Sequence, residues 1–135
     1  MAVLIDADVI IEAERGTFDL FAWLAQRPDE EFKLAAITVA ELWHGVERAT
    51  AAHRRKRQEF LEGILATFET APYTERTALA HARVWAELES NGQMIGAHDV
   101  ILAATALERG DAVATFNVRH FAAVPGLTVI TPSAG

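Results

Sequence analysis

The chain has 135 residues, of which 51% are hydrophobic and 23% charged, and its formal net charge is −7. A chain of this length is expected to form one domain, residues 1–135. The negative charge argues against general polyanion binding, and no apolar run reaches the roughly 18 residues that cross a bilayer. Cysteine is absent, so disulfides and thiolate metal sites are excluded. The first residues lack a basic leader, and a cytoplasmic protein is expected.

The hydrophobic pattern predicts short strands that alternate with helices. Strands are predicted, in chain order, over residues 2–5, 33–37, 68–73, 112–116 and 127–130. Helices are predicted over residues 9–15, 17–27, 38–50, 53–69, 75–89 and 97–109. Pro72 cannot donate to a central ladder and indicates an edge strand, and residues 131–135 are expected to fray. This alternation predicts an α/β fold, a parallel sheet covered on both faces.

The helix predicted over residues 97–109 is apolar on nearly every face except at its start. From Ala97 to Leu107, only three side chains are clearly polar, those of His98, Asp99 and Thr105. Such a helix is normally buried, so a negative charge is expected at the edge of a core. Taken alone, Asp99 is better explained as a capping residue or as an offset to the helix dipole.

Other polar residues follow the predicted strands. Asp6 follows the first strand, Glu41 lies in the first turn after the second, and Asn117 follows the fourth. Parallel sheets bind ligands beyond these carboxyl ends. Each residue also has a structural explanation, because Asp6 or Asp8 could cap the first helix, Thr38 and Glu41 match a capping box, and Asn117 suits a turn.

The carboxylates of Asp6, Glu41 and Asp99, if gathered at one end of a sheet, would repel one another unless a bound cation or raised pKa values relieved the repulsion. A metal site therefore explains their joint occurrence best. A set of oxygen ligands favours Mg²⁺, with Mn²⁺ possible, over Zn²⁺. A Mg²⁺ ion held by few carboxylates usually awaits phosphate oxygens, which favours phosphoester chemistry.

The basic residues gather in one cluster, residues 53–57, at the start of the helix predicted over residues 53–69. Two explanations stay open for it. The cluster is a solvated face with an Arg55 to Glu59 ion pair, or it steers a polyanion.

Four motifs occur in order along nearly the whole chain: LIDADVII with Asp6, ITVAELWHGVERA with Glu41, GAHDVILAATAL with Asp99, and VATFNVRHF with Asn117. Together they resemble the PIN-domain family and, within it, the VapC-type ribonuclease toxins of type II toxin–antitoxin systems. The resemblance implies a five-stranded parallel sheet of order 3-2-1-4-5. It also implies a homodimer, a VapB-like antitoxin partner and Mg²⁺-dependent endoribonuclease activity on RNA.

The resemblance also assigns residue roles. Asp6 and Asp99 are expected to contact the metal directly, and Glu41 directly or through a water that it orients or deprotonates. The fourth family acid falls at Asn117, an amide, which favours one tightly held ion over two. The residues expected to surround the acids or contact phosphate are Thr38, His98, Thr115 and Arg119.

Apolar side chains of two segments are candidates for interfaces, although core packing explains each of them as well. The candidates for an antitoxin groove are Leu20, Phe21, Trp23 and Trp43. The candidates for a dimer interface lie on one stripe of the helix predicted over residues 75–89, namely Leu79, Ala82, Trp85 and Ala86.

Three other functions remain open at this point. A haloacid-dehalogenase-like phosphatase would use Asp6 and Asp8 as nucleophile and acid. A metal-free ribonuclease would use His98 and His120 as acid and base. A catalytically weak PIN-like module would only bind RNA or a partner, a possibility for which Asn117 is the sequence hint.

Overall fold

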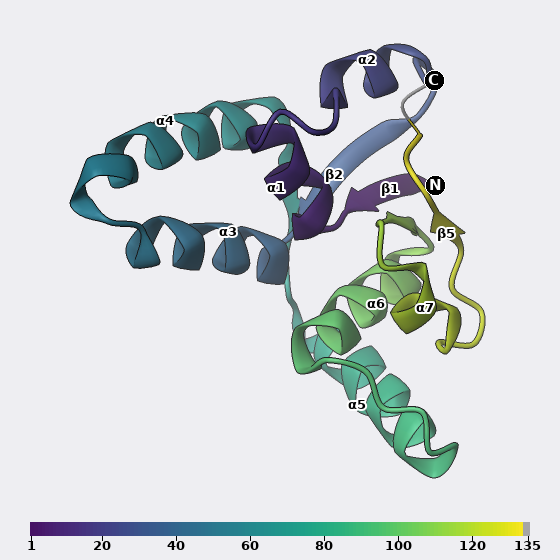
Figure 1. The fold of residues 1–135 in the computed structure, drawn as a ribbon. Coiled ribbons are helices and arrows are strands. Elements are labelled where there is room, and N and C mark those ends of the chain that lie inside the picture. Colours follow the sequence, from purple (N-terminus) through teal and green to yellow (C-terminus); the bar gives the residue numbers. More distant parts are fainter. Residues whose placement is uncertain (134–135) are drawn as a thin grey trace.

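Five short strands form one parallel sheet in the order β3-β2-β1-β4-β5 (Figure 1). The computed structural model describes residues 1–133, and its strands are β1 (Ala2–Ile5), β2 (Glu31–Ala35), β3 (Glu69–Ala71), β4 (Ala112–Ala114) and β5 (Val129–Ile130). β1 is central because Leu4 pairs with Lys33 on one side and with Val113 on the other. The predicted α/β class, the strand order and the position of β3 at an edge are confirmed.

Helices cover both faces of this sheet. They are α1 (Ala7–Glu14), α2 (Leu20–Ala25), α3 (Ala36–Arg48), α4 (Ala51–Thr67), α5 (Glu75–Ser90), α6 (Ala97–Arg109) and α7 (Val118–Ala122). Figure 1 shows α3 and α4 as a hairpin that extends away from the sheet, and α5 lying along α6. The short helix α7 was not predicted, because five residues carry too little periodicity to stand out.

Side chains of the strands alternate between two cores, as the pleat of a strand requires. Leu4 and Val113 point into a core formed with α5, α6 and α7. Val3 and Ile5 point to the other face, into a core formed with α1, α2 and α4. Every residue of β1 is buried, which explains its continuous apolar sequence.

The boundary between β2 and α3 differs from the prediction by two residues. The strand ends at Ala35 and the helix begins at Ala36, so Thr38 lies inside the first turn, and no side chain caps the helix. The predicted capping box of Thr38 and Glu41 is therefore wrong. The β-branched pair Ile37 and Thr38 favours strand locally, but pairing with β1 and β3 sets the end of β2.

The helices α5 and α6 differ in burial. The buried residues of α6 include Leu102, Ala103 and Ala104, as its apolar sequence predicted. In α5, Val84 and Leu88 face the core, whereas Leu79 and Trp85 are exposed. The stripe proposed for a dimer interface is thus an outer face of the chain.

The remaining differences from the predictions concern the candidates for an antitoxin groove and the C-terminal tail. Leu20 and Trp23 are buried in the core, whereas Phe21 is exposed, so these three do not form one groove. Pro132 is buried rather than frayed, and residues 134–135 of the predicted tail lie outside the described residues. Within residues 1–133, no helix combines the length and the apolar character that a membrane span requires.

Candidate active site

Asp6 lies where β1 ends and α1 begins. Its backbone N–H donates to the carbonyl of Ala114, which ties it to β4 at 2.9 Å. Its Oδ1 accepts from the N–H of Ala7 at 2.8 Å, so Asp6 does cap α1. Its Oδ2 accepts from the hydroxyl of Thr115 at 2.8 Å. Only 6% of Asp6 is exposed, so the strand end and Thr115 fix a nearly desolvated carboxylate.

Asp8 is a second carboxylate on the same side, and it was not among the predicted metal ligands. Its Oδ2 accepts from the N–H of Phe116 at 3.1 Å and lies 3.4 Å from the Thr115 hydroxyl. Its Oδ1 is buried and has no hydrogen-bond partner within residues 1–133. The spacing Asp6-x-Asp8 was visible in the sequence, but it was assigned only to helix capping or to the phosphatase alternative.

Glu41 and Asp99 reach the cluster from two helices, α3 and α6. Glu41 Oε2 lies 3.5 Å from Nδ1 of His98, whose side chain is 60% exposed. Asp99 stands in the first turn of α6, but Gly96 is the N-cap and no side chain caps the helix. The capping explanation of Asp99 is therefore excluded, although its charge still suits the helix N-terminus.

His120 joins Asp99 to Asn117. Its Nδ1 lies 3.0 Å from Asp99 Oδ2 and 2.8 Å from Asn117 Nδ2. Because Nδ1 carries at most one proton, it either donates to Asp99 or accepts from the amide. The backbone N–H of Asn117 donates to Thr115 Oγ1 at 2.9 Å. Asn117 is thus connected to Asp6 through Thr115 and to Asp99 through His120.

Repulsion among the carboxylates adds to burial in raising the pKa values of Asp6, Asp8 and Glu41. Burial, then the charge of Asp8, raises the pKa of Asp6 to about 7, and Asp99 adds to this rise. Burial is also the main cause that raises the pKa of Asp8 and that of Glu41, and the charge of Asp99 raises both further. The protonated form of His98 opposes the rise at Glu41. The cluster is therefore a site of concentrated negative charge at the carboxyl edge of the sheet.

The donors present fit a hard divalent cation. All four carboxylates offer oxygen, and the buried Oδ1 of Asp8 is a lone acceptor that a cation or its water would satisfy. Among the described residues, no three His, Asp or Glu side chains converge closely enough to enclose an ion by themselves. Mg²⁺ is usually held by one or two carboxylates and keeps several waters, so such a closed cage is not required.

Two of the predicted surrounding residues do not contact the acids. Thr38 is fully buried, and its Oγ1 has no hydrogen-bond partner within residues 1–133. Arg119 is exposed in α7, and no hydrogen bond joins it to the acids in the described part of the chain. Thr115 and His98 do contact acids, at Asp6 and Glu41.

Comparison with known proteins identifies the family. The sequence model of the PIN-domain family matches residues 3–127 of this chain. Ribonuclease VapC1 of Rickettsia felis is 31% identical over 134 residues, which are 98% of each chain. The chain belongs to the PIN-domain family, among the VapC ribonucleases. The resemblance of the four motifs is thereby confirmed, and the phosphatase alternative has no support.

Solved VapC-type structures share the whole fold. The crystal structure of FitAcB from Neisseria gonorrhoeae contains a chain with a TM-score of 0.85 and 33% identity, and the match covers 96% of this chain and 97% of that one. A chain of VapBC2 from Rickettsia felis, bound to a promoter DNA fragment, has a TM-score of 0.90 at 21% identity, covering 98% of this chain and 100% of that one. This second likeness concerns the fold alone.

Proposed function

We propose that this chain is a Mg²⁺-dependent endoribonuclease that acts as the toxin of a toxin–antitoxin pair. The observation that carries the proposal is the set of carboxylates Asp6, Asp8, Glu41 and Asp99, in which burial and the neighbouring charges raise the pKa values of Asp6, Asp8 and Glu41. The mutual repulsion of these carboxylates destabilises the folded chain unless it is neutralised, and a bound cation would neutralise it. Family membership supplies the substrate class, RNA.

The residues have distinct roles in this proposal. Asp6 and Asp99 hold the ion, Glu41 orients or deprotonates the attacking water, and Thr115 fixes the direction of the Asp6 carboxylate. When bound, a divalent cation would polarise the scissile phosphate and lower the pKa of water. Hydrolysis by water leaves 5′-phosphate and 3′-hydroxyl ends.

A single ion is favoured over two. The family's fourth acid is Asn117 here, and its side chain contacts the imidazole of His120 rather than a carboxylate. An amide adds no negative charge to offset a second divalent ion. Asn117 therefore contributes by positioning its neighbours or by a hydrogen bond to a bound water.

The partners follow from the relatives. A solved structure from Mycobacterium tuberculosis, 30% identical to this chain, is described as a member of the VapBC family of toxin-antitoxin systems, which favours a VapB-like antitoxin for this chain. A homodimer is also proposed, because Leu79 and Trp85 lie on an outer face of α5, where each is about half exposed. Since RNA is the substrate, the cytoplasm is the proposed location.

The test uses purified protein and total RNA, with Mg²⁺ or EDTA, and sequencing of new 5′ ends. Wild-type protein should cut only with metal, and the Asp6→Ala and Asp99→Ala variants should be at least about a thousandfold slower. Equal cutting by the Asp99→Ala variant would remove the assignment of that residue.

The same experiment separates the other two functions. Cutting that survives EDTA and leaves cyclic or 3′-phosphate ends would indicate metal-free catalysis by His98 and His120. Mg²⁺ binding without any cutting would indicate a binding module.

A further inference from the structure

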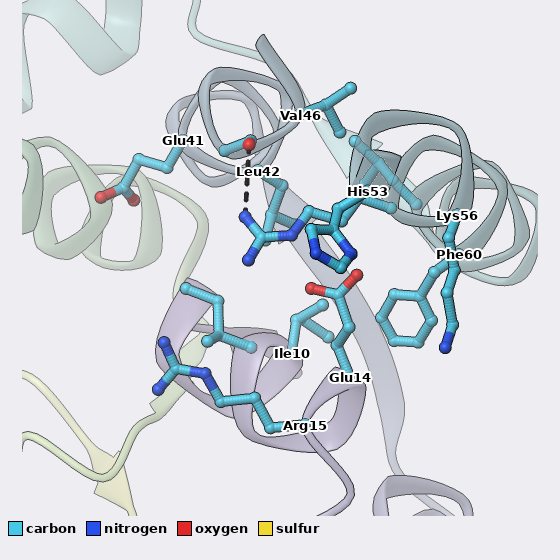
Figure 2. A pocket seen from close by; sticks show the side chains of 13 residues that line it. Ile10, Glu14, Arg15, Glu41, Leu42, Val46, His53, Lys56 and Phe60 are labelled. Atoms are coloured by element: carbon cyan, nitrogen blue, oxygen red, sulfur yellow. Dashed lines mark hydrogen bonds between the residues drawn. The ribbon is translucent and has the colours of Figure 1, made fainter. Parts of the chain in front are cut away.

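A groove opens between α1, α3 and α4, beside the carboxylate cluster (Figure 2). Its volume is about 460 Å³. Ile10, Leu42 and Phe60 provide apolar surface, and Figure 2 shows all three side chains directed toward the same space. The groove is therefore amphipathic, because charged or basic side chains from α4 and from the end of α1, together with Glu41, complete its lining.

The basic cluster of residues 53–57 divides into two groups. Arg54 donates to the carbonyl of Glu47 at 3.0 Å, and Arg55 pairs with Glu59 at 3.1 Å on an exposed face. Neither of these arginines lines the groove. The solvated ion pair that was one explanation of the cluster thus accounts for Arg55 only.

The second group lines the groove and consists of His53, Lys56 and Arg57. Arg57 donates to the carbonyl of Gly45 at 3.4 Å, the contact drawn in Figure 2. Within residues 1–133, no carboxylate lies within ion-pair distance of Lys56. Glu14 of α1 also lines the groove, and Figure 2 shows its carboxylate near His53, but no ion pair within residues 1–133 joins it to His53, Lys56 or Arg57. A chain of net charge −7 therefore places three basic side chains of one helix along one groove.

The groove is continuous with the carboxylate cluster through Glu41. Glu41 belongs to the groove lining, and its carboxylate also contacts His98 of α6. Figure 2 shows this carboxylate at one end, turned away from the basic side chains, and Lys56 on the opposite side of the view. A strand cut beside Glu41 can thus continue along the basic wall.

We propose that this groove holds single-stranded RNA next to the scissile phosphate, with Lys56, Arg57 and His53 contacting phosphates and Phe60 contacting a base. The proposal rests on the proposed ribonuclease function and identifies where its substrate lies. Basic walls that follow the backbone, combined with an aromatic side chain for stacking, are the usual means of binding single strands. The volume is near the lower end of small-ligand sites, which suits one or two nucleotides.

The test compares two double variants that remove equal charge from the same helix. Lys56→Ala with Arg57→Ala changes the groove, and Arg54→Ala with Arg55→Ala is the matched control. Binding of a fluorescein-labelled, mixed-sequence, single-stranded RNA of about 12 nucleotides is followed by anisotropy, in EDTA and in Ca²⁺. The groove variant should bind roughly tenfold more weakly, and its slope of log K against log salt should flatten by about 1.4. The control should stay within about twofold of wild type.

Two further measurements make the result decisive. Thermal unfolding checks that both double variants fold. If the double variant of Lys56 and Arg57 does not fold, the single variant Lys56→Ser, at an exposed position, takes its place. In wild type, RNA that carries 5-iodouracil should crosslink to the peptide containing Phe60.

Equal binding by both double variants, or no RNA binding by wild type in either buffer, would overturn the groove assignment and leave the groove to a protein partner. Neither result would affect the proposed function, which fails only if wild type does not cut RNA with metal.

Discussion

The two halves of the carboxylate cluster are held in different ways. Asp6 and Asp8 follow a buried strand, and their oxygens accept from backbone N–H groups and from Thr115. Glu41 and Asp99 reach in from helices, have side chains 29% and 21% exposed, and face histidines. Asp6 is 6% exposed. The strand half, Asp6 at the end of β1 and Asp8 in the first turn of α1, is therefore held by several hydrogen bonds and contains the most desolvated carboxylate, Asp6, whereas the helix half, Glu41 and Asp99, is held through histidines.

Because the two halves differ in burial, substitutions in them should affect folding stability and metal binding to different degrees. A desolvated carboxylate costs folding free energy whenever it is ionised without a counter-charge. A partly exposed carboxylate costs less, because water still solvates it. Substitutions in the strand half should therefore change both folding and metal binding, and those in the helix half mainly the latter.

The largest effect is expected for Asp6→Asn in the absence of metal. The pKa of Asp6 is about 7 in the folded chain against 3.8 ordinarily. Between these values the folded state retains a proton that the unfolded state has lost, so stability falls as pH rises through this window. The full penalty above pH 7 is at most about 4 kcal/mol. In EDTA at pH 8 the variant should be more stable than wild type, and the gain should vanish near pH 4.

Urea unfolding at several pH values measures this gain. Asp99→Asn is the matched control from the helix half and should change stability little. Mg²⁺ should stabilise wild type more than the Asp6→Asn variant, because binding to the folded state adds to stability. The same pH dependence in wild type and in the Asp6→Asn variant would contradict the contrast between the two halves.

A smaller effect is expected for Thr115→Val, which keeps the shape but removes the donor to Asp6 Oδ2. That hydrogen bond lowers the pKa of Asp6, so its loss should raise this pKa further. Cleavage at pH 7 should fall about tenfold, the effect of one hydrogen bond to a charged group. The acidic limb of the pH–rate profile should move to higher pH, with recovery in alkaline buffer. Thr105→Val, which removes a hydroxyl bonded to Ile101 within α6, is the control; an equal loss there would indicate a general packing defect.

The smallest effect is expected for His120→Ala in the helix half. The imidazole contacts Asp99 at 3.0 Å, but its side chain is 47% exposed. Exposed pairs of this kind contribute less than about 1 kcal/mol, so Mn²⁺ affinity should fall less than about fivefold. Calorimetric titration with Mn²⁺ measures this loss, and His120→Asn, which retains a polar side chain, should recover part of it. A fall in Mn²⁺ affinity larger than the fall that the same titration gives for Thr115→Val would show that the histidines, and not the strand end, determine the site.

The resemblance of the four motifs implied the sheet order, and the strand pattern predicted the edge of the sheet at which the site lies, because parallel strands bring their carboxyl ends to one edge. The sequence did not predict His120 as the neighbour of Asp99. The two residues are 21 positions apart, and their contact depends on the short helix α7. Nor did it predict that Asp8 shares the site, because a carboxylate two residues after Asp6 is equally suited to helix capping.

The sequence by itself determined the α/β class, the burial of α6 and the family, since periodicity, breaker residues and ordered motifs are local features. Only the tertiary structure decided which apolar stripe faces outward. Leu79, Ala82, Trp85 and Ala86 share one face of α5, yet that face is exposed, and the opposite face packs on the core through Val84 and Leu88. The tertiary structure also decided which basic residues of α4 line a groove. An amphipathic helix has the same period whichever neighbour it meets, so its orientation is set by packing.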